Sequence, residues 1–221
     1  MNLTYYILFS VIIFLFLIAL YRRLSYSPGD EGEYAVFQQL KRLPEDKYYI
    51  INDLMFHRRN GHTTQIDHVV VSPYGIFVIE TKNISGHIYG SEYSKTWTRY
   101  WKGYARGGYY DEDELTFDNP VLQNGAHVKA LYEQLSIYNV RLIPIIAFSD
   151  EAELKVNVHG VDVVYWSDVV DVIKRYKEPM ITIEEVREIC DRLLSIDITD
   201  KEARKQHAIN AQINKEKYNR N

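Results

Sequence analysis

Three charged residues around a short turn have the types and spacing to hold a metal ion. Asp67 lies in a run of β-branched residues, and Glu80 and Lys82 follow a second apolar run beyond Pro73–Gly75. Two strands joined by this turn would place Asp67 roughly opposite Glu80 or Lys82, because both lie about equally far from the turn. Side chains two apart share a strand face, so Glu80 and Lys82 point the same way. Carboxylate and carbonyl oxygens are the ligands that a hard divalent cation prefers.

A structural explanation for these charges stands beside the metal site. Oppositely charged residues at the end of a hairpin commonly form a solvated cross-strand ion pair. The position of Glu80 favours the metal site, because four consecutive apolar residues, 76–79, precede it. Glu80 should therefore lie at the edge of a buried strand, where a charge needs a partner or a metal.

The order of these residues resembles a known family. The D…ExK pattern formed by Asp67, Glu80 and Lys82 fits the PD-(D/E)XK nuclease superfamily, and the chain resembles the nuclease-related domain (NERD) family over about residues 30 to 145. The matching positions are Gly32-Glu33, Gln65-Ile66-Asp67-His68, the run from Tyr74 to Asn83, Gly86, Trp97, Asn119-Pro120-Val121-Leu122-Gln123-Asn124 and His127.

The resemblance implies metal-dependent hydrolysis of phosphodiester bonds in DNA. Asp67 and Glu80 would hold Mg²⁺ or Mn²⁺, with the Thr81 carbonyl as a further ligand. Lys82 would orient or activate the attacking water and stabilise charge on the phosphate. The metal would supply Lewis acidity and lower the pKa of a bound water. We expect no small-molecule cofactor.

Two predicted helices would bring further polar groups to this site. Glu33 lies near the start of a predicted helix, where the resemblance implies a carboxylate that supports the metal site; the alternative is a simple first-turn acid. Asn119, Gln123 and His127 lie at the start of another helix. The resemblance places them near the metal, with Gln123 supporting catalysis and Asn119 and His127 contacting nucleic acid. A helix cap and hydrogen bonds at the core edge explain the same residues.

A segment rich in basic and aromatic residues, 95–110, is a candidate nucleic-acid surface. Arginine and lysine pair with phosphates while aromatic rings stack on bases, so Arg99, Lys102 and Arg106 are predicted to contact DNA or RNA. The alternative is an ordinary strand with its aromatic residues in the core. We interpret Asp111–Glu114 as a solvated loop. Because the net charge is −4, nucleic-acid binding would depend on such a local patch.

The beginning of the chain has the pattern of a membrane anchor. Leu3–Leu20 contains no charged residue, and eighteen helical residues span about 27 Å, close to the hydrocarbon thickness of a bilayer. We therefore predict a single-pass transmembrane anchor over 1–24 and a linker over 25–30. Arg22 and Arg23 follow the apolar run, so the positive-inside rule places the rest of the chain in the cytoplasm.

The remaining pattern predicts an α/β fold with a restriction-endonuclease-like mixed sheet flanked by helices. Strands alternate with helices, beginning with a helix from Asp30 to Pro44, and the apolar run 140–148 is typical of a central buried strand. The predicted nuclease domain covers 31–196. Residues 197–221 form a basic tail, either a solvated helix or disordered, which could touch nucleic acid or anionic lipid.

Two functional hypotheses follow. The first is a membrane-anchored, metal-dependent nuclease facing the cytoplasm. The second is a catalytically silent nucleic-acid-binding or membrane-tethered scaffolding module on the same fold. The presence of Asp67, Glu80 and Lys82 together favours the enzyme.

Overall fold

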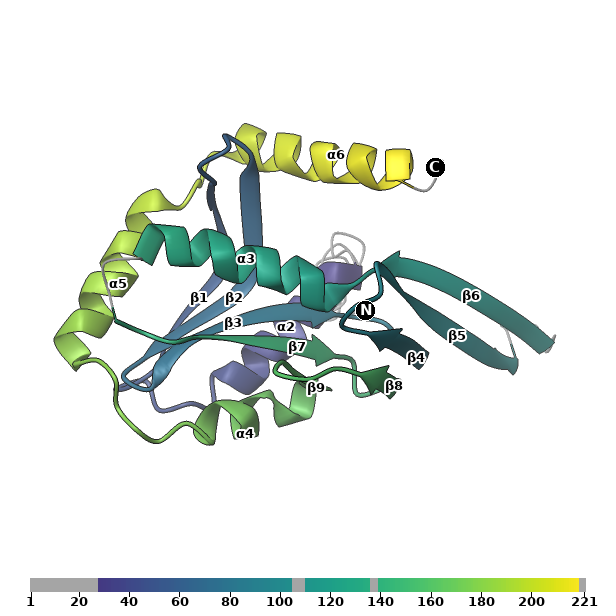
Figure 1. Ribbon diagram of the computed structural model, residues 1–221, viewed down its shortest axis with the longest axis horizontal. Helices are drawn as coiled ribbons and strands as arrows, with labels where there is room; N and C mark the ends of the chain where they lie inside the picture. Colours follow the sequence, from purple (N-terminus) through teal and green to yellow (C-terminus); the bar gives the residue numbers. More distant parts are fainter. Residues whose placement is uncertain (1–27, 105–109, 136–138, 219–221) are drawn as a thin grey trace, which may run out of the picture.

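The computed structural model describes residues 28–104, 110–135 and 139–218, which form two β-sheets and their flanking helices (Figure 1). The helices are α2 (Pro28–Leu40), α3 (Pro120–Leu135), α4 (Val169–Lys174), α5 (Ile183–Ile196) and α6 (Lys201–Tyr218), with a 3₁₀ turn η1 (Trp166–Asp168). The strands are β1 (Tyr49–His57), β2 (Thr63–Ser72), β3 (Gly75–Lys82), β4 (Gly86–Ser91), β5 (Thr96–Tyr104), β6 (Tyr110–Asp118), β7 (Leu142–Phe148), β8 (Ala152–Asn157) and β9 (Asp162–Tyr165).

The larger sheet is mixed, as the sequence predicted, and has the strand order β1-β2-β3-β7-β9. β1, β2 and β3 form an antiparallel meander, whereas β3, β7 and β9 are parallel. The central strand β3 is buried from Gly75 to Glu80. Gly75 has a φ of 143° and lies so near Ile143 that a side chain there would collide with it, which explains the glycine in the turn.

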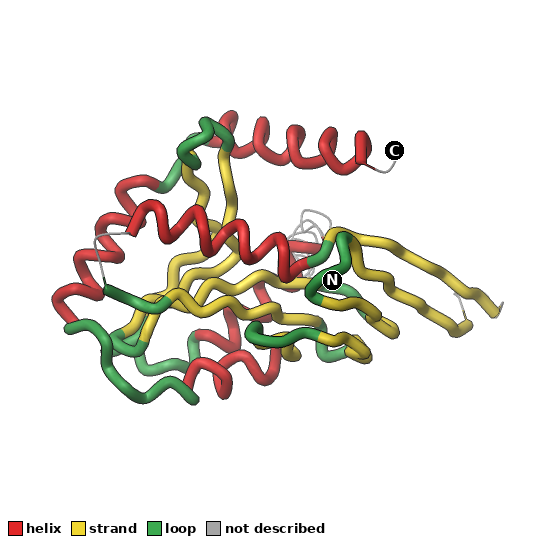
Figure 2. The backbone as a smooth tube through the Cα atoms, in the orientation of Figure 1, coloured by secondary structure: helices red, strands yellow, loops and turns green. Residues whose placement is uncertain are grey.

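Helices cover both faces of this sheet (Figure 2). On one face, α3 and α5 bury leucine, isoleucine and valine side chains against β1, β2 and β3. On the other face, α2 and α4 pack against β2, β3 and β7. Cys190 is buried on α5 within the same core. The central strands are therefore apolar on both faces, which is why their sequences read as continuous apolar runs.

A second sheet, β6-β5-β4-β8, was not predicted as a separate layer. It packs on the end of β7, where Trp97 is fully buried and stacks on Phe148 with ring centroids 5.9 Å apart. Gly90 allows this packing, because a β-carbon there would overlap the Trp97 ring. Strands β5 and β6 extend from the body as a two-stranded arm (Figure 1).

Two local predictions differ from the structure, and a third had left a helix and disorder open for the basic tail. Asp111–Glu114 is part of strand β6, not a loop, because each of its residues has a cross-strand partner on β5. The first helix begins at Pro28, inside the predicted linker, and ends at Leu40 rather than Pro44; proline is accepted in a first helical turn because its missing N–H would have no partner there. The basic tail contains a long helix, α6, from Lys201 to Tyr218.

The predicted membrane anchor, Leu3–Leu20, lies outside the described residues. From residue 28 onward, no described helix has both the length and the apolar character needed to cross a bilayer.

Candidate active site

The site forms where strands β2 and β3 separate. Their antiparallel pairing ends at His68 and Ile79, so the next position along the register would pair Asp67 with Glu80. The Thr81 N–H donates to the Asp67 carboxylate rather than to a backbone carbonyl, and Oδ2 lies 2.7 Å from the nitrogen. The hairpin predicted from the turn thus brings the two acids together.

Glu80 is a buried carboxylate with a cation as its partner. It is 3% exposed, and its Oε1 lies 2.6 Å from Lys82 Nζ. The same ammonium group donates to Gln123 Oε1, 3.0 Å away on α3. Lys82 is therefore held between a carboxylate and an amide, and two of its three N–H groups are used. The predicted pairing of Glu80 with Lys82 on one face and the predicted approach of Gln123 are both present in the structure.

His127 of α3 contacts the other oxygen of Glu80. Its Nε2 lies 3.3 Å from Oε2, close enough for charge interaction. The arrangement lacks hydrogen-bond geometry, and neither atom has another hydrogen-bond partner among the described residues. On its far side, Nδ1 of His127 shares a hydrogen bond of 2.8 Å with Thr64 Oγ1. The histidine predicted to contact nucleic acid thus lies within the carboxylate site, 12% exposed.

Glu33 reaches the site because α2 packs closely on the end of β3. A β-carbon at the preceding residue, Gly32, would lie 2.9 Å from Asn83 Cβ and 3.3 Å from Thr81 Cγ2. Only glycine allows this part of α2 to approach so closely. The charge of Glu33 is then near enough to Asp67 to raise its pKa.

The surroundings shift the pKa values of Asp67 and Glu80 in opposite directions. Burial raises the pKa of Asp67 well above its usual range, and the negative charges of Glu80 and Glu33 raise it further; the Thr81 N–H and Lys82 oppose them. Burial would also raise the pKa of Glu80, but Lys82 and His127 outweigh it and hold that pKa below its usual value. Glu80 is therefore the more acidic member of the pair, and Asp67 is the one that is protonated more easily.

These residues fit a divalent cation in chemistry, although the cluster is small. No group of three or more His, Cys, Asp or Glu side chains arranged for a metal ion is found within the described ranges. Two observations support the fit. Glu80 Oε2 is buried without a hydrogen bond among the described residues, and Asp67 carries the repulsion of two other carboxylates, which a cation would relieve. Asp67, Glu80 and the Thr81 carbonyl are the groups that would hold it.

The described residues that were predicted to bind nucleic acid on β5 and before α3 are engaged by other parts of the protein. Arg99 pairs with Asp113, and Lys102 Nζ lies 2.8 Å from Glu112, so β6 neutralises both cations. Arg106 lies outside the described residues. Asn119 is 1% exposed, and its amide nitrogen donates to carbonyls of the loop from Ser91 to Ser94. Asn119 therefore caps and anchors α3 and leaves no free donor for a phosphate.

Sequence reasoning missed several residues that support the site. His68 is 1% exposed, and its Nδ1 shares a 2.8 Å hydrogen bond with Asn52; burial lowers the pKa of His68 to about 4, against the opposing charge of Glu80. Asn124 is fully buried and donates to two strand carbonyls, of Val78 and Ile145. A buried polar residue inside an apolar pattern is the signal that could have found both.

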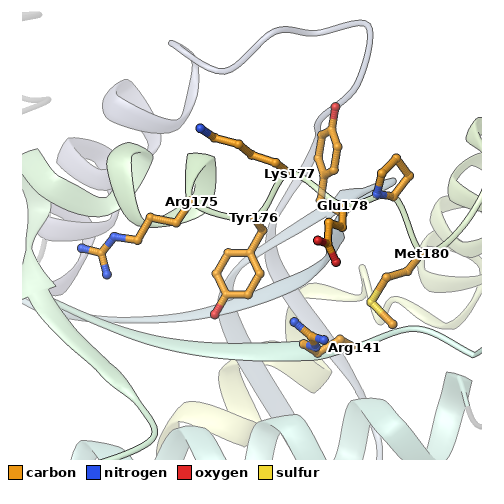
Figure 3. A pocket seen from close by; sticks show the side chains of 8 residues that line it. Arg141, Arg175, Tyr176, Lys177, Glu178 and Met180 are labelled. Carbon is orange, nitrogen blue, oxygen red and sulfur yellow. The ribbon is translucent and has the colours of Figure 1, made fainter.

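Two surface cavities lie away from the acids. One, of about 540 Å³, lies at the opposite end of β3, where Tyr74, Arg141, Arg175, Tyr176 and Lys177 are among its lining residues (Figure 3). The other, of about 570 Å³, lies between the β1–β2 connection and α6. Neither cavity contains a residue predicted for catalysis.

The fold and the paired acids define an α/β protein of the PD-(D/E)XK type. A family model described as nuclease-related domain (NERD) matches residues 28–149, more than half of the chain. The chain is also 37% identical over 182 residues to an uncharacterized protein of Bacillus anthracis, covering 81% of each chain. The protein therefore belongs to the NERD family. No solved structure matches it.

Proposed function

We propose that this protein is a metal-dependent nuclease whose catalytic residues are Asp67, Glu80 and Lys82. The observation that carries the proposal is the convergence of the two acids at the separated ends of β2 and β3, with Lys82 Nζ 2.6 Å from Glu80. Membership of a nuclease-related family supports the same reaction class. A Mg²⁺ or Mn²⁺ ion bound here would polarise a phosphoryl oxygen and lower the pKa of a bound water.

The side chains of this chain have separable tasks in such a reaction. Glu80, kept ionised by Lys82 and His127, supplies fixed negative charge to the cation. Among the described residues, Lys82 bonds to Glu80 and Gln123, and its third N–H would orient the attacking water or donate to the phosphate. Gln123 sets the direction in which that group points. Glu33 adds negative charge from the start of α2.

DNA is the proposed substrate, reached from the cytoplasmic face of a membrane. The anchor over Leu3–Leu20 and the orientation set by Arg22 and Arg23 rest on the sequence pattern. Because β6 neutralises Arg99 and Lys102, binding would depend mainly on contacts made at the site itself.

A cleavage assay tests the proposed function. The purified full-length chain is incubated with supercoiled plasmid, linear duplex, single-stranded DNA and RNA, with Mg²⁺, Mn²⁺ or EDTA. We expect cleavage of DNA with a divalent ion, and a fall to the level seen with EDTA in Asp67→Asn and Glu80→Gln. Glu153→Gln is the matched control, because Glu153 and Lys155 form the same Glu-x-Lys spacing on an exposed strand.

Two results would refute the nuclease proposal. DNA binding without cleavage, unchanged in Asp67→Asn, would support the silent nucleic-acid-binding module instead. Cleavage that survives both substitutions at the acids would show that the activity lies elsewhere.

A further inference from the structure

One residue of β1 has an unusual backbone conformation. Asp53 has a φ of 55°, and it is the one described residue other than glycine with a positive φ. Aspartate tolerates the left-handed region better than most residues, but the conformation still costs free energy. Such a residue persists where its surroundings hold it in place.

Asp53 lies directly across from a proposed metal ligand. The pairs on either side of it join Asn52 to His68 and Leu54 to Ile66, so the residue opposite Asp53 is Asp67. The β2–β3 pairing also stops at this level. Asp67 therefore lies where regular pairing is interrupted on both sides of its strand.

In both strands, the alternation between core-facing and outward-facing side chains shifts by one residue at this level. Ile51 and Leu54 of β1 contact the same core beneath α3 and α5, and so do Ile66 and Val69 of β2. Side chains on one face of a strand are normally an even number of residues apart, yet each of these pairs is three apart. The shift in β1 falls at Asp53 and the shift in β2 falls at Asp67–His68. The two strands thus rotate about their axes at the same level. This joint turn of β1 and β2 sets the direction of the Asp67 carboxylate.

Arg204 of α6 holds Asp53 in this conformation. Its Nη1 lies 2.6 Å from Asp53 Oδ2, and its Nη2 donates to the Asp53 carbonyl at 3.0 Å. The same guanidinium is fixed by Asp197 Oδ1 at 2.9 Å and by the Ile198 carbonyl at 2.7 Å. Gln65 binds the remaining Asp53 oxygen at 2.7 Å. Arg204 thus binds both the side chain and the backbone of the strained residue.

A second contact joins α6 to the same part of β2. His207 Nδ1 shares a 2.6 Å hydrogen bond with Thr63 Oγ1. The next residue, Thr64, binds His127, which in turn contacts Glu80. The C-terminal helix is therefore connected to the neighbourhood of both acids.

We propose that Arg204 is a positioning residue for the carboxylate site. By holding Asp53 in the left-handed conformation, it maintains the joint turn of β1 and β2 that directs Asp67 toward the Thr81 N–H. Helix α6 is thereby part of the support of the site, although it lies beyond residues 28–149, the span of the family match. The inference rests on the proposed function for its consequence in metal binding.

Amide hydrogen exchange tests the positioning directly, and it requires no metal. The full-length chain is compared with Arg204→Met, Asp53→Val and Asp53→Gly. Valine strongly disfavours a positive φ, whereas glycine adopts it without strain. Arg175→Met is the matched control, because Arg175 forms an exposed ion pair of 3.0 Å with Asp162. The measured quantities are the exchange rate of the Thr81 amide and the affinity for Mn²⁺.

We expect Arg204→Met and Asp53→Val to speed exchange at Thr81 and to weaken Mn²⁺ binding by about tenfold, as loss of a supporting contact does at other metal sites. Arg175→Met should leave both values close to those of the wild type. Asp53→Gly keeps the positive φ but loses the carboxylate that Arg204 binds, so it should lie closer to the wild type than Asp53→Val does. Should Arg204→Met fail to fold, the contrast between Asp53→Val and Asp53→Gly decides the question.

Equal exchange at Thr81 in Asp53→Val and Asp53→Gly would overturn the inference, because the backbone conformation at residue 53 would then be irrelevant to Asp67. Wild-type protein that binds no Mn²⁺ would instead refute the proposed function. In that case the exchange rates still show whether Arg204 positions Asp67.

Discussion

The Glu-x-Lys spacing of the site recurs at Glu153 and Lys155, in a different environment. Glu80 and Lys82 are 3% and 18% exposed, with a nitrogen–oxygen distance of 2.6 Å. Glu153 and Lys155 are 56% and 43% exposed, with a distance of 2.9 Å. Geometry alone makes the pairs look alike, but only the first has lost most of its water. Burial is therefore what makes the first pair consequential for stability and chemistry.

Replacing the buried lysine should show this difference. Lys82→Met leaves the Glu80 carboxylate buried without its lysine partner, so the free energy of unfolding should fall by about 3 kcal/mol. Lys155→Met removes a solvated partner from an exposed pair and should lower the free energy of unfolding far less. Urea denaturation at pH 7 measures both. Equal losses in the two variants would show that burial does not distinguish the pairs.

At the scale of elements, α3 can carry part of the site because two asparagines anchor its beginning to a loop and to two strands. Asn119 binds the loop after β4, and Asn124 donates to β3 and β7 at 2.9 and 3.0 Å. Gln123 and His127, on the same helix, then reach Lys82 and Glu80. Thus the asparagines hold α3, and the glutamine and histidine contact the charged groups.

The close approach of α2 gives an element-scale prediction. In Gly32→Ala, the new methyl group meets Asn83 Cβ at 2.9 Å and Trp166 at 3.1 Å, so α2 must move away from β3. We expect a loss of about 1–3 kcal/mol in stability, typical of overpacking, together with weaker metal binding as Glu33 shifts.

Gly125→Ala is the matched control in another helix. A β-carbon there meets nothing within 4 Å, so alanine should be neutral or stabilise by up to about 1 kcal/mol. Thermal melting and Mn²⁺ titration of both variants provide the comparison. Equal behaviour of the two alanines would mean that α2 does not depend on close packing at Gly32.

At the scale of the whole molecule, local patterns predicted the hairpin but not the second sheet. The turn at Pro73–Gly75 and the apolar runs beside it were sufficient to place Asp67 near Glu80. β8 escaped notice because Ala152–Asn157 is only six residues long, although its apolar and polar residues alternate as in a half-buried strand. Its partner, β4, lies more than sixty residues earlier, and no local pattern reports such a pairing.

The support from α6 was equally hidden in the sequence. Arg204 and Asp53 are separated by 151 residues, and each looks like an ordinary surface charge. Likewise, Arg99 and Lys102 appeared to be a basic patch until the acidic strand β6 was found beside them. In both cases the role of a charged residue depends on the element that packs beside it, and the residue type alone does not reveal that element.

The central claim is that Asp67 and Glu80 share a divalent cation, and thermal unfolding of the full-length chain in Mn²⁺ against EDTA tests it most directly. An ion at 100 times its Kd stabilises the folded state by about 2.7 kcal/mol, or roughly 5–10 °C for a chain of this size. Asp67→Asn should abolish most of this shift and raise the melting temperature in EDTA slightly, since one repelling charge is gone. Glu153→Gln should keep the full shift. No shift in the wild type, with Asp67→Asn simply less stable, would contradict the account and leave the acids as a structural cluster with Lys82.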